Sequence, residues 1–145
     1  KYFKRIPKII IVEPDRADCV LQSIKNNKLK KIKIKRESIM GGMSCNEMSY
    51  IPWQILKKAS NWCVTVSDRN VAKTVAMLKD KKLSKNSIIG GECSTPGIIS
   101  LIGVCNNYKT KKLIELNEKS NVLVIGCEGN ADVKLYKQLL SKGRK

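Results

Sequence analysis

The stretch VLVIGCEGNADVKLY, residues 122–136, is the most informative about the fold of this sequence. Residues 122–125 are apolar and rich in β-branched side chains, which predicts a buried strand. A glycine turn follows from Gly126 to Gly129, and Asp132 can then cap a helix. Strand, glycine turn and helix in this order are typical of phosphate and cofactor sites. The turn carries a glutamate and no lysine, serine or threonine, so its ligand is not obviously a phosphate.

The rest of the chain repeats this alternation of strands and helices. Strands are predicted at 8–12, 29–35, 63–66 and 122–125, and helices at 15–26, 52–59, 68–80, 96–105, 108–119 and 132–141. Two of the strands are apolar throughout, which is typical of a parallel sheet covered on both faces. We therefore predict an α/β fold of three layers, αβα, with a mainly parallel sheet. Glu13, at the end of the first strand, is interpreted as structural, with Asp15 and Asp18 as helix-start residues.

Composition narrows the class of protein. The 145 residues suit a single domain, and only 5% are aromatic, so the core must consist mostly of Ile, Leu and Val. The six cysteines lack the close spacing of a zinc knuckle, and the absence of histidine excludes a Ser-His-Asp or Cys-His hydrolase within this chain. Cys19, Cys63 and Cys105 are interpreted as small buried apolar residues. Without a signal peptide or a membrane-spanning run, we expect a cytoplasmic protein with reduced thiols and no membrane partner.

The net charge of +17 raises nucleic acid as a partner. The basic residues are nearly all lysines scattered along the chain, and arginines and aromatics for base contacts are few. A general bias in composition therefore explains the charge better, and nucleic acid is not expected as a partner. The alternative is a small basic, non-enzymatic binding module carried by LKKIKIKR, residues 29–36.

Three loops with glycines are candidate ligand sites: Gly41-Gly42, Gly90-Gly91 and the turn from Gly126 to Gly129. In open parallel α/β sheets, ligands bind beyond the carboxyl ends of the strands. Each loop has the alternative interpretation of a tight turn, and none matches a phosphate-binding motif. The carboxylates of Glu92 and Glu128 suit a cationic or hydrogen-donating partner, although Glu128 could equally point into solvent.

Taken together, these loops resemble a known family. The chain is similar to the carboxy-terminal part of the diaminopropionate ammonia-lyases, pyridoxal-phosphate enzymes of fold type II. Four stretches carry the resemblance: IIIVEPDRADCV (9–20), SIMGGMSCNEMSYIPWQIL (38–56), VTVSDRNVAKTV…IIGGECSTPG (64–97) and VLVIGCEGNADVKLY (122–136). The more general scheme is shared with the threonine dehydratases and the tryptophan synthase β chain.

The resemblance implies a lyase that uses pyridoxal phosphate to convert 2,3-diaminopropionate, a small amino acid, to pyruvate and ammonia by β-elimination. Family members hold the cofactor through a lysine Schiff base and are usually homodimers. It implies a cofactor-binding group and a loop beside the substrate. These are Glu92, Gly126, Cys127 and Gly129 for the cofactor, and Gly41, Gly42, Ser44 and Cys45 for the substrate loop. Either Gly126 or Cys127 takes the position of the Ser or Thr that meets the ring nitrogen, and no metal site is expected.

The resemblance also implies an absence. The Schiff-base lysine segment and the glycine-rich phosphate loop should precede this region, so covalent attachment of the cofactor at the family position is not possible in this chain. The chain begins with Lys1 rather than Met. We therefore expect residues 1–145 to be one domain, the carboxy-terminal portion of a larger enzyme, which is inactive alone. A separate upstream chain that completes the enzyme stays open as a partner.

Overall fold

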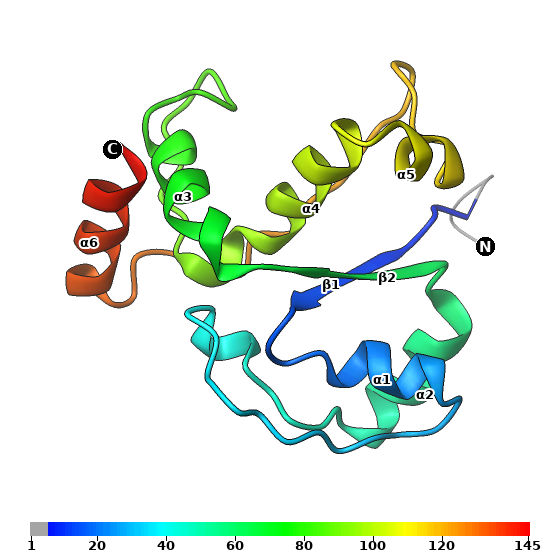
Figure 1. Cartoon of the computed structure of the whole chain (residues 1–145). Coiled ribbons are helices and arrows are strands. Elements are labelled where there is room, and N and C mark those ends of the chain that lie inside the picture. The colour runs from blue at the N-terminus through cyan, green and yellow to red at the C-terminus, as the bar shows by residue number, and fades with distance from the viewer. Residues whose placement is uncertain (1–5) are drawn as a thin grey trace.

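The structure, a computed structural model, describes residues 6–145, so Lys1 and the inference drawn from it lie outside the described residues. Its centre is a parallel pair of strands, β1 (Ile10–Pro14) and β2 (Trp62–Val66). Ile10 pairs with Trp62 and Pro14 with Val66. The strands predicted at 8–12 and 63–66 are thereby confirmed, with small shifts in their ends. Figure 1 shows the pair running across the middle of the molecule.

Helices lie on both sides of this pair. The α-helices are α1 (Cys19–Lys25), α2 (Tyr50–Ala59), α3 (Val71–Lys79), α4 (Pro96–Cys105), α5 (Tyr108–Leu113) and α6 (Val133–Gly143), and the 3-10 turns are η1 (Gly41–Met43), η2 (Asp68–Asn70) and η3 (Glu92–Ser94). In Figure 1, α4 covers one side of the strands, while α1 and α2 lie on the other side. The predicted three-layer α/β fold is confirmed. None of the helices within residues 6–145 is long and apolar enough to cross a membrane.

Local sequence explains several helix ends. Pro96 opens α4 at its first helical position, as predicted. Asp132 accepts a hydrogen bond from the backbone N–H of Leu135 at 2.9 Å and so caps α6. The helix predicted at 15–26 begins only at Cys19. Its N-terminus is capped by a residue of the preceding strand, because the carboxylate of Glu13 on β1 accepts hydrogen bonds from the N–H groups of Val20 and Leu21 at 3.1 and 2.6 Å. Glu13 is structural, as predicted.

The main core lies where α3, α6 and two of the short turns meet. It consists of Met40, Val66, Val71, Ala72, Val75, Cys93, Ile99, Tyr136 and Leu139. Side chains at or next to η1 and η3 enter this cluster, since Met40 is 0% and Cys93 is 6% exposed. The loops that carry the candidate site are therefore seated on the best-packed part of the molecule.

The strand predicted at 29–35 is wrong, although its pattern of exposure is right. Lysines and isoleucines alternate between exposed and half-buried positions from Lys31 to Lys35. Within the described residues, this segment makes one backbone hydrogen bond of the kind that links strands. It joins the N–H of Ile32 to the carbonyl of Asn46 at 2.8 Å. One such bond does not make a strand, because a strand needs a partner along its length. The helix predicted at 108–119 is also shorter, ending at Leu113.

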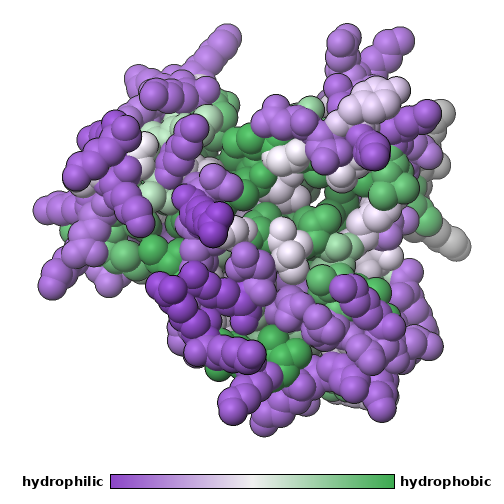
Figure 2. Space-filling view, in the orientation of Figure 1, coloured by the Kyte–Doolittle hydropathy of each residue, from purple (hydrophilic) through white to green (hydrophobic). Residues whose placement is uncertain are grey.

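The buried strand predicted at 122–125 is wrong too. Leu123 and Ile125 are 87% and 77% exposed, and the segment forms no sheet with the described residues. Cys105, predicted to be buried, is likewise exposed. Figure 2 shows hydrophilic side chains over much of one face, with hydrophobic residues visible between them in the middle. The apolar sequence of 122–125 thus marks an uncovered surface in this structure.

The position of Glu13 predicts a pH dependence of stability. Burial raises the pKa of Glu13 above its ordinary value, outweighing the hydrogen bonds from Leu21 and Val20, which lower the pKa. A raised pKa favours the protonated folded form, so its contribution is present below about pH 4.3 and is lost as the pH rises through the raised pKa. The free energy of unfolding should fall over that interval. Urea titrations at several pH values should show this slope in the wild type and a weaker slope in Glu13→Gln.

Candidate functional site

The first part of the candidate site is the loop of residues 38–46, which is fastened to the carboxyl end of β2. Asp68, just beyond β2, accepts hydrogen bonds from the hydroxyl of Ser38 at 2.6 Å and the N–H of Ile39 at 3.2 Å. The same carboxylate pairs with the guanidinium of Arg16 at 2.5 Å. Asp68 therefore ties the segment after β1, the loop and the end of β2 together at one edge of the sheet.

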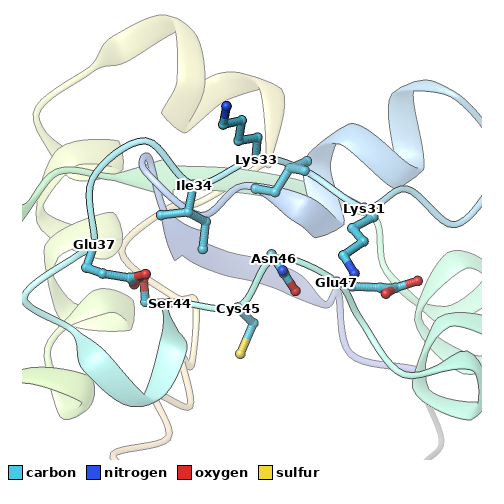
Figure 3. A pocket seen from close by; sticks show the side chains of 9 residues that line it. Lys31, Lys33, Ile34, Glu37, Ser44, Cys45, Asn46 and Glu47 are labelled. Carbon is cyan, nitrogen blue, oxygen red and sulfur yellow. Dashed lines mark hydrogen bonds between the residues drawn. The ribbon is translucent and has the colours of Figure 1, made fainter.

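Within this loop, the predicted substrate residues lie in different settings. Gly41 and Gly42 form the 3-10 turn η1. The Ser44 hydroxyl donates to the carboxylate of Glu37 and accepts the N–H of Ser38 at 3.3 Å, while Cys45 is exposed. Figure 3 shows Ser44 directed toward Glu37 and Cys45 pointing away from the facing segment.

Beside the loop is a hollow of about 900 Å³, open to solvent. Its wall consists of Lys31, Ile32, Lys33, Ile34, Glu37, Ser44, Cys45, Asn46 and Glu47. The substrate-loop residues Gly41 and Gly42 do not line this hollow. The hollow is therefore adjacent to η1 rather than part of the glycine turn.

The second part of the site is an interlock between the Gly90-Gly91 loop and the turn from Gly126 to Gly129. The N–H of Gly91 donates to the carbonyl of Glu128 at 3.1 Å, and the N–H of Cys93 donates to the Glu128 carboxylate at 2.9 Å. The Ser94 hydroxyl accepts the N–H of Glu128 at 3.0 Å and donates to its carbonyl. The two segments, 34 to 37 residues apart in sequence, thus behave as one unit.

The first and second parts also meet. A Cβ atom at Gly42 would lie 3.4 Å from the Sγ of Cys93, which is ordinary contact distance. The turns η1 and η3 are in contact with each other, and η3 carries the interlock. The structure therefore brings all three glycine loops, widely separated in sequence, to the carboxyl edge of the strand pair. This is the arrangement in which open α/β sheets bind ligands.

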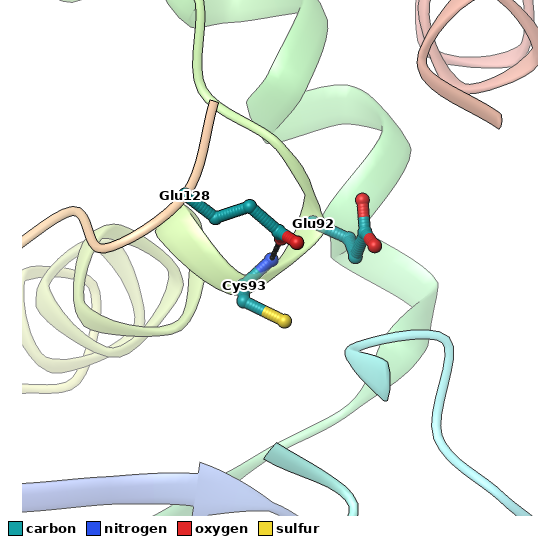
Figure 4. Close-up of side chains that lie close together, drawn as sticks. All are labelled: Glu92, Cys93 and Glu128. Carbon is teal, nitrogen blue, oxygen red and sulfur yellow. Dashed lines mark hydrogen bonds between the residues drawn. The ribbon is translucent and has the colours of Figure 1, made fainter. Parts of the chain in front are cut away.

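The two glutamates of the site have different roles. Figure 4 shows the Glu128 carboxylate reaching the backbone of Cys93, while the Glu92 carboxylate points away from it. Glu128 thus caps the start of η3 with one of its carboxylate oxygens. Glu92 makes no side-chain hydrogen bond to another residue within the part of the chain described. Burial, and then the nearby charge of Glu128, raise the pKa of Glu92.

Glu92, Cys93 and Glu128 form a cluster of potential metal ligands. Ligand atoms of Glu92, Cys93 and Glu128 lie within 4.8 Å of one another. An oxygen of Glu128 is already used by the N–H of Cys93. Burial, followed by the hydrogen bond to Glu128, raises the pKa of the Cys93 thiol to about 11, so the group is a neutral thiol at pH 7. Within this cluster, the Glu128 carboxylate already holds the backbone of η3 in place.

The residues at the end of the 122–125 segment offer only weak, neutral hydrogen-bonding groups. Cys127 is exposed, and its thiol donates one long hydrogen bond, 3.4 Å, to the carbonyl of Cys93. A thiol is a weak and neutral partner, which leaves it free to exchange this contact for another. A Cβ at Gly126 would meet only Ser94, at 3.5 Å. The Glu92 carboxylate nearby is likewise not engaged with another described side chain.

Sequence reasoning missed the residues that assemble the site. Asp68 and Ser38 hold the first loop, and Ser94 holds the interlock. A signal for Asp68 was present, because the pair Ser67-Asp68 follows directly on a predicted strand and must lie at its carboxyl end. Ser94 had a weaker signal as a small polar residue just before a Thr-Pro helix start. The interlock itself had none, since it joins segments that are distant in sequence.

Comparisons with known proteins match the resemblance seen in the motifs. No model of a known protein family matches the chain. The diaminopropionate ammonia-lyase of Escherichia coli K12 is 31% identical over 138 residues, which are 93% of this chain and 35% of that enzyme. The enzyme of Salmonella typhimurium is 27% identical over 150 residues, which are 99% of this chain and 37% of that enzyme. The chain therefore spans about a third of the length of these curated relatives.

Solved structures agree with the sequence matches. The E. coli diaminopropionate ammonia-lyase in complex with an aminoacrylate–PLP azomethine reaction intermediate has a TM-score of 0.80 and 30% identity, covering 93% of this chain and 34% of that one. Its complex with D-serine has a TM-score of 0.83 and 29% identity. Maize serine racemase, at 18% identity and a TM-score of 0.69, shares the fold. The fold is therefore part of a fold type II pyridoxal-phosphate enzyme domain, and the predicted resemblance is confirmed.

Proposed function

We propose that this chain, similar throughout to about a third of the diaminopropionate ammonia-lyases, forms part of a pyridoxal-phosphate enzyme that converts 2,3-diaminopropionate to pyruvate and ammonia. The observation that carries the proposal is the convergence of the three glycine loops at the carboxyl edge of the sheet. The sequence match extends over 93% of the chain and so includes all three loops. Pyridoxal phosphate supplies the electron sink for removal of the α-proton and loss of the β-amino group.

In this proposal, the interlocked unit lies under the nitrogen end of the cofactor ring. Gly126, Gly129 and the Cys127 thiol form the turn that meets the ring, with the thiol as a neutral hydrogen-bond partner of the ring nitrogen. Glu92, whose pKa is raised by burial, lies beside the ring and influences its protonation. The rigid backbone of η3, fixed by Ser94 and Glu128, orients both groups.

The substrate loop has the role of closing the pocket from the other side. Gly42 lies against η3, since a Cβ there would be 3.4 Å from the Sγ of Cys93, and a Cβ at Gly41 would meet only open space. Ser44 and Cys45 follow on the same loop, beside the hollow of Figure 3. A small amino acid with two amino groups would be oriented by this loop against the ring.

The larger assembly is also part of the proposal. The Schiff-base lysine and the phosphate loop would come from a part of the enzyme outside residues 1–145, which themselves form one carboxy-terminal domain. The chain alone should then be inactive. The complete enzyme would be a cytoplasmic homodimer.

A covalent fusion tests the proposed function. In the E. coli diaminopropionate ammonia-lyase, the third that this chain matches is replaced by residues 1–145. We expect the fusion to bind pyridoxal phosphate, to show the absorbance of a lysine imine and to release pyruvate from 2,3-diaminopropionate. Residues 1–145 alone should show neither property. A folded fusion without imine absorbance, or a borohydride-trapped imine on one lysine of the isolated chain, would contradict the proposal.

Within the fusion, Glu92→Gln tests the role of the site carboxylate. Loss of the charge beside the ring should reduce kcat/KM by about tenfold, equal to about 1.4 kcal/mol of transition-state stabilisation, and should shift the pH profile of the imine absorbance. Glu118→Gln is the matched control, because Glu118 is exposed and takes no part in the hydrogen bonds of the interlock. Equal effects of the two substitutions on absorbance and rate would rule out the assigned role of Glu92.

A further inference from the structure

The loop that the proposed function assigns to the substrate is closed at its base and buried at its tip. The base is the hydrogen bond from the N–H of Ile32 to the carbonyl of Asn46, at 2.8 Å. The tip is Met40, which is 0% exposed and belongs to the main core. Compact surface loops with close ends, known as Ω-loops, are often functional. Between base and tip, the second limb of this loop, residues 44–46, depends on contacts with the first limb, residues 32–39.

A single side chain holds the second limb. The hydroxyl of Ser44 donates to the carboxylate of Glu37 and accepts the N–H of Ser38 at 3.3 Å. Among residues 6–145, no other side-chain hydrogen bond involves residues 44–46. Figure 3 shows the Ser44 side chain directed toward Glu37. A hydroxyl has one hydrogen to donate, and hydrogen bonds to a carboxylate are the stronger kind, so Glu37 is the main partner of Ser44.

The backbone of Glu37 is itself fixed. The guanidinium of Arg16 donates to the Glu37 carbonyl at 3.3 Å and to the carboxylate of Asp68 at 2.5 Å. Asp68 also accepts from the hydroxyl of Ser38, the residue after Glu37, at 2.6 Å. These bonds close a ring that consists of Arg16, Asp68, Ser38, Ser44 and Glu37. Because a supported backbone holds its side chains in turn, the ring lets Glu37 determine where Ser44 lies.

We infer that Glu37 is a positioning residue, which acts through the hydroxyl of Ser44 to keep Ser44 and Cys45 in place beside an amino-acid substrate. This inference rests on the proposed function, which assigns these two residues to the substrate. Glu37 is exposed and lines the hollow, whereas Gly41 and Gly42 of η1, the turn that contacts η3, do not. The carboxylate therefore acts on the substrate loop and not on the ring. Its removal should weaken substrate binding and leave the chemical step unchanged.

The kinetics of the fusion enzyme test this role. Glu37→Ala should raise the KM for 2,3-diaminopropionate by about fivefold, the ratio that one ordinary hydrogen bond represents, with kcat unchanged. Glu37→Gln should restore most of the loss, because the carboxamide oxygen can accept from the same hydroxyl. In a fusion that already carries Ser44→Ala, Glu37→Ala should have no further effect. A fall in kcat, or a further rise in KM on the Ser44→Ala background, would overturn the inference.

Glu47 provides a matched control within the same hollow. Like Glu37, it is an exposed glutamate of the wall, but among residues 6–145 its side chain forms no hydrogen bond. Glu47→Ala removes the same charge near the loop and leaves the Ser44 contact intact, so the KM should stay unchanged. An equal rise in KM for Glu47→Ala and Glu37→Ala would mean that the charge of the hollow attracts the substrate, and would refute the positioning role.

Amide hydrogen exchange in the 145-residue chain separates this inference from the proposed function. Glu37→Ala should speed exchange at Ser38 and at residues 44–46 by about fivefold. The exchange of Ile39, whose N–H is held by Asp68 at 3.2 Å, and the unfolding midpoint should stay unchanged. An active fusion without this change in exchange would overturn the role of Glu37 and leave the chemistry intact. A fusion that forms no imine, with the change in exchange observed, would refute the chemistry while the hold of Glu37 on Ser44 stands.

Discussion

Asp68→Ala is expected to lower the free energy of unfolding by about 3 kcal/mol and to release the loop of residues 38–46 from the sheet. The carboxylate accepts from the Ser38 hydroxyl and the Ile39 N–H and pairs with Arg16. The Asp68 side chain is only 14% exposed, so water replaces these contacts poorly. Urea denaturation gives the loss of stability, and proteolysis within residues 38–46 should become faster.

The control for this prediction is another ion pair on the same protein. Asp80→Ala removes the pair with Arg144 at 2.6 Å, in which the arginine side chain is 52% exposed. Ion pairs that water reaches contribute little to stability, so this variant should be near the wild type. If the two variants are equally stable, Asp68 does not organise the loop in the way that its hydrogen bonds indicate.

Gly91→Ala is expected to cost about 3 kcal/mol and to separate the turn of residues 126–129 from η3. Its backbone has φ −74° and ψ −173°, a conformation open to any residue, so the effect arises from space alone. A Cβ at Gly91 would lie 2.2 Å from the carbonyl oxygen of Gly129 and 3.0 Å from the Glu128 carboxylate. Backbone on the far side must move, and the hydrogen bond of the Gly91 N–H to Glu128 is lost with it.

Amide hydrogen exchange and the imine absorbance of the fusion test the effect of Gly91→Ala. The N–H of Cys93, which donates to Glu128, should exchange faster in Gly91→Ala. The fusion enzyme carrying this substitution should lose most of its imine absorbance, because the turn under the ring is displaced. The control is Gly103→Ala, since a Cβ at Gly103 meets nothing within 4 Å. A Gly91→Ala variant as stable as Gly103→Ala would show that the interlock yields easily.

Much of the fold could be predicted because its signals are local. The helix of residues 96–105 is specified by a proline start and an apolar run, and the last helix by Asp132 and its amphipathic spacing. The segments 29–35 and 122–125 also have strand patterns in their exposure, yet neither forms a strand in the structure. A strand depends on its partner as well as on its own residues, and a local sequence pattern does not specify that partner.

The sequence predicted the loops of the candidate site but not the hydrogen bonds that join them. Each glycine loop stands out locally, but the bonds that join the loops connect Glu128 with Cys93 and Asp68 with Ser38, which are 35 and 30 residues apart. The role of Glu13 shows the same limit, because its side chain caps a helix from the preceding strand. Side chains that satisfy distant backbone groups cannot be recognised until the path of the chain is known.

The uncovered apolar residues at 122–125 have a consequence for the colloidal behaviour of the free chain. Uncovered apolar strands with unpaired backbone attract their own copies and can nucleate aggregates. The net charge of +17 opposes this, because like-charged molecules repel each other before the edges touch. Salt shortens that repulsion to about 3 Å at 1 M. The lysines scattered over the surface, which contribute nothing to the proposed chemistry, thus keep the protein dispersed when the ionic strength is low.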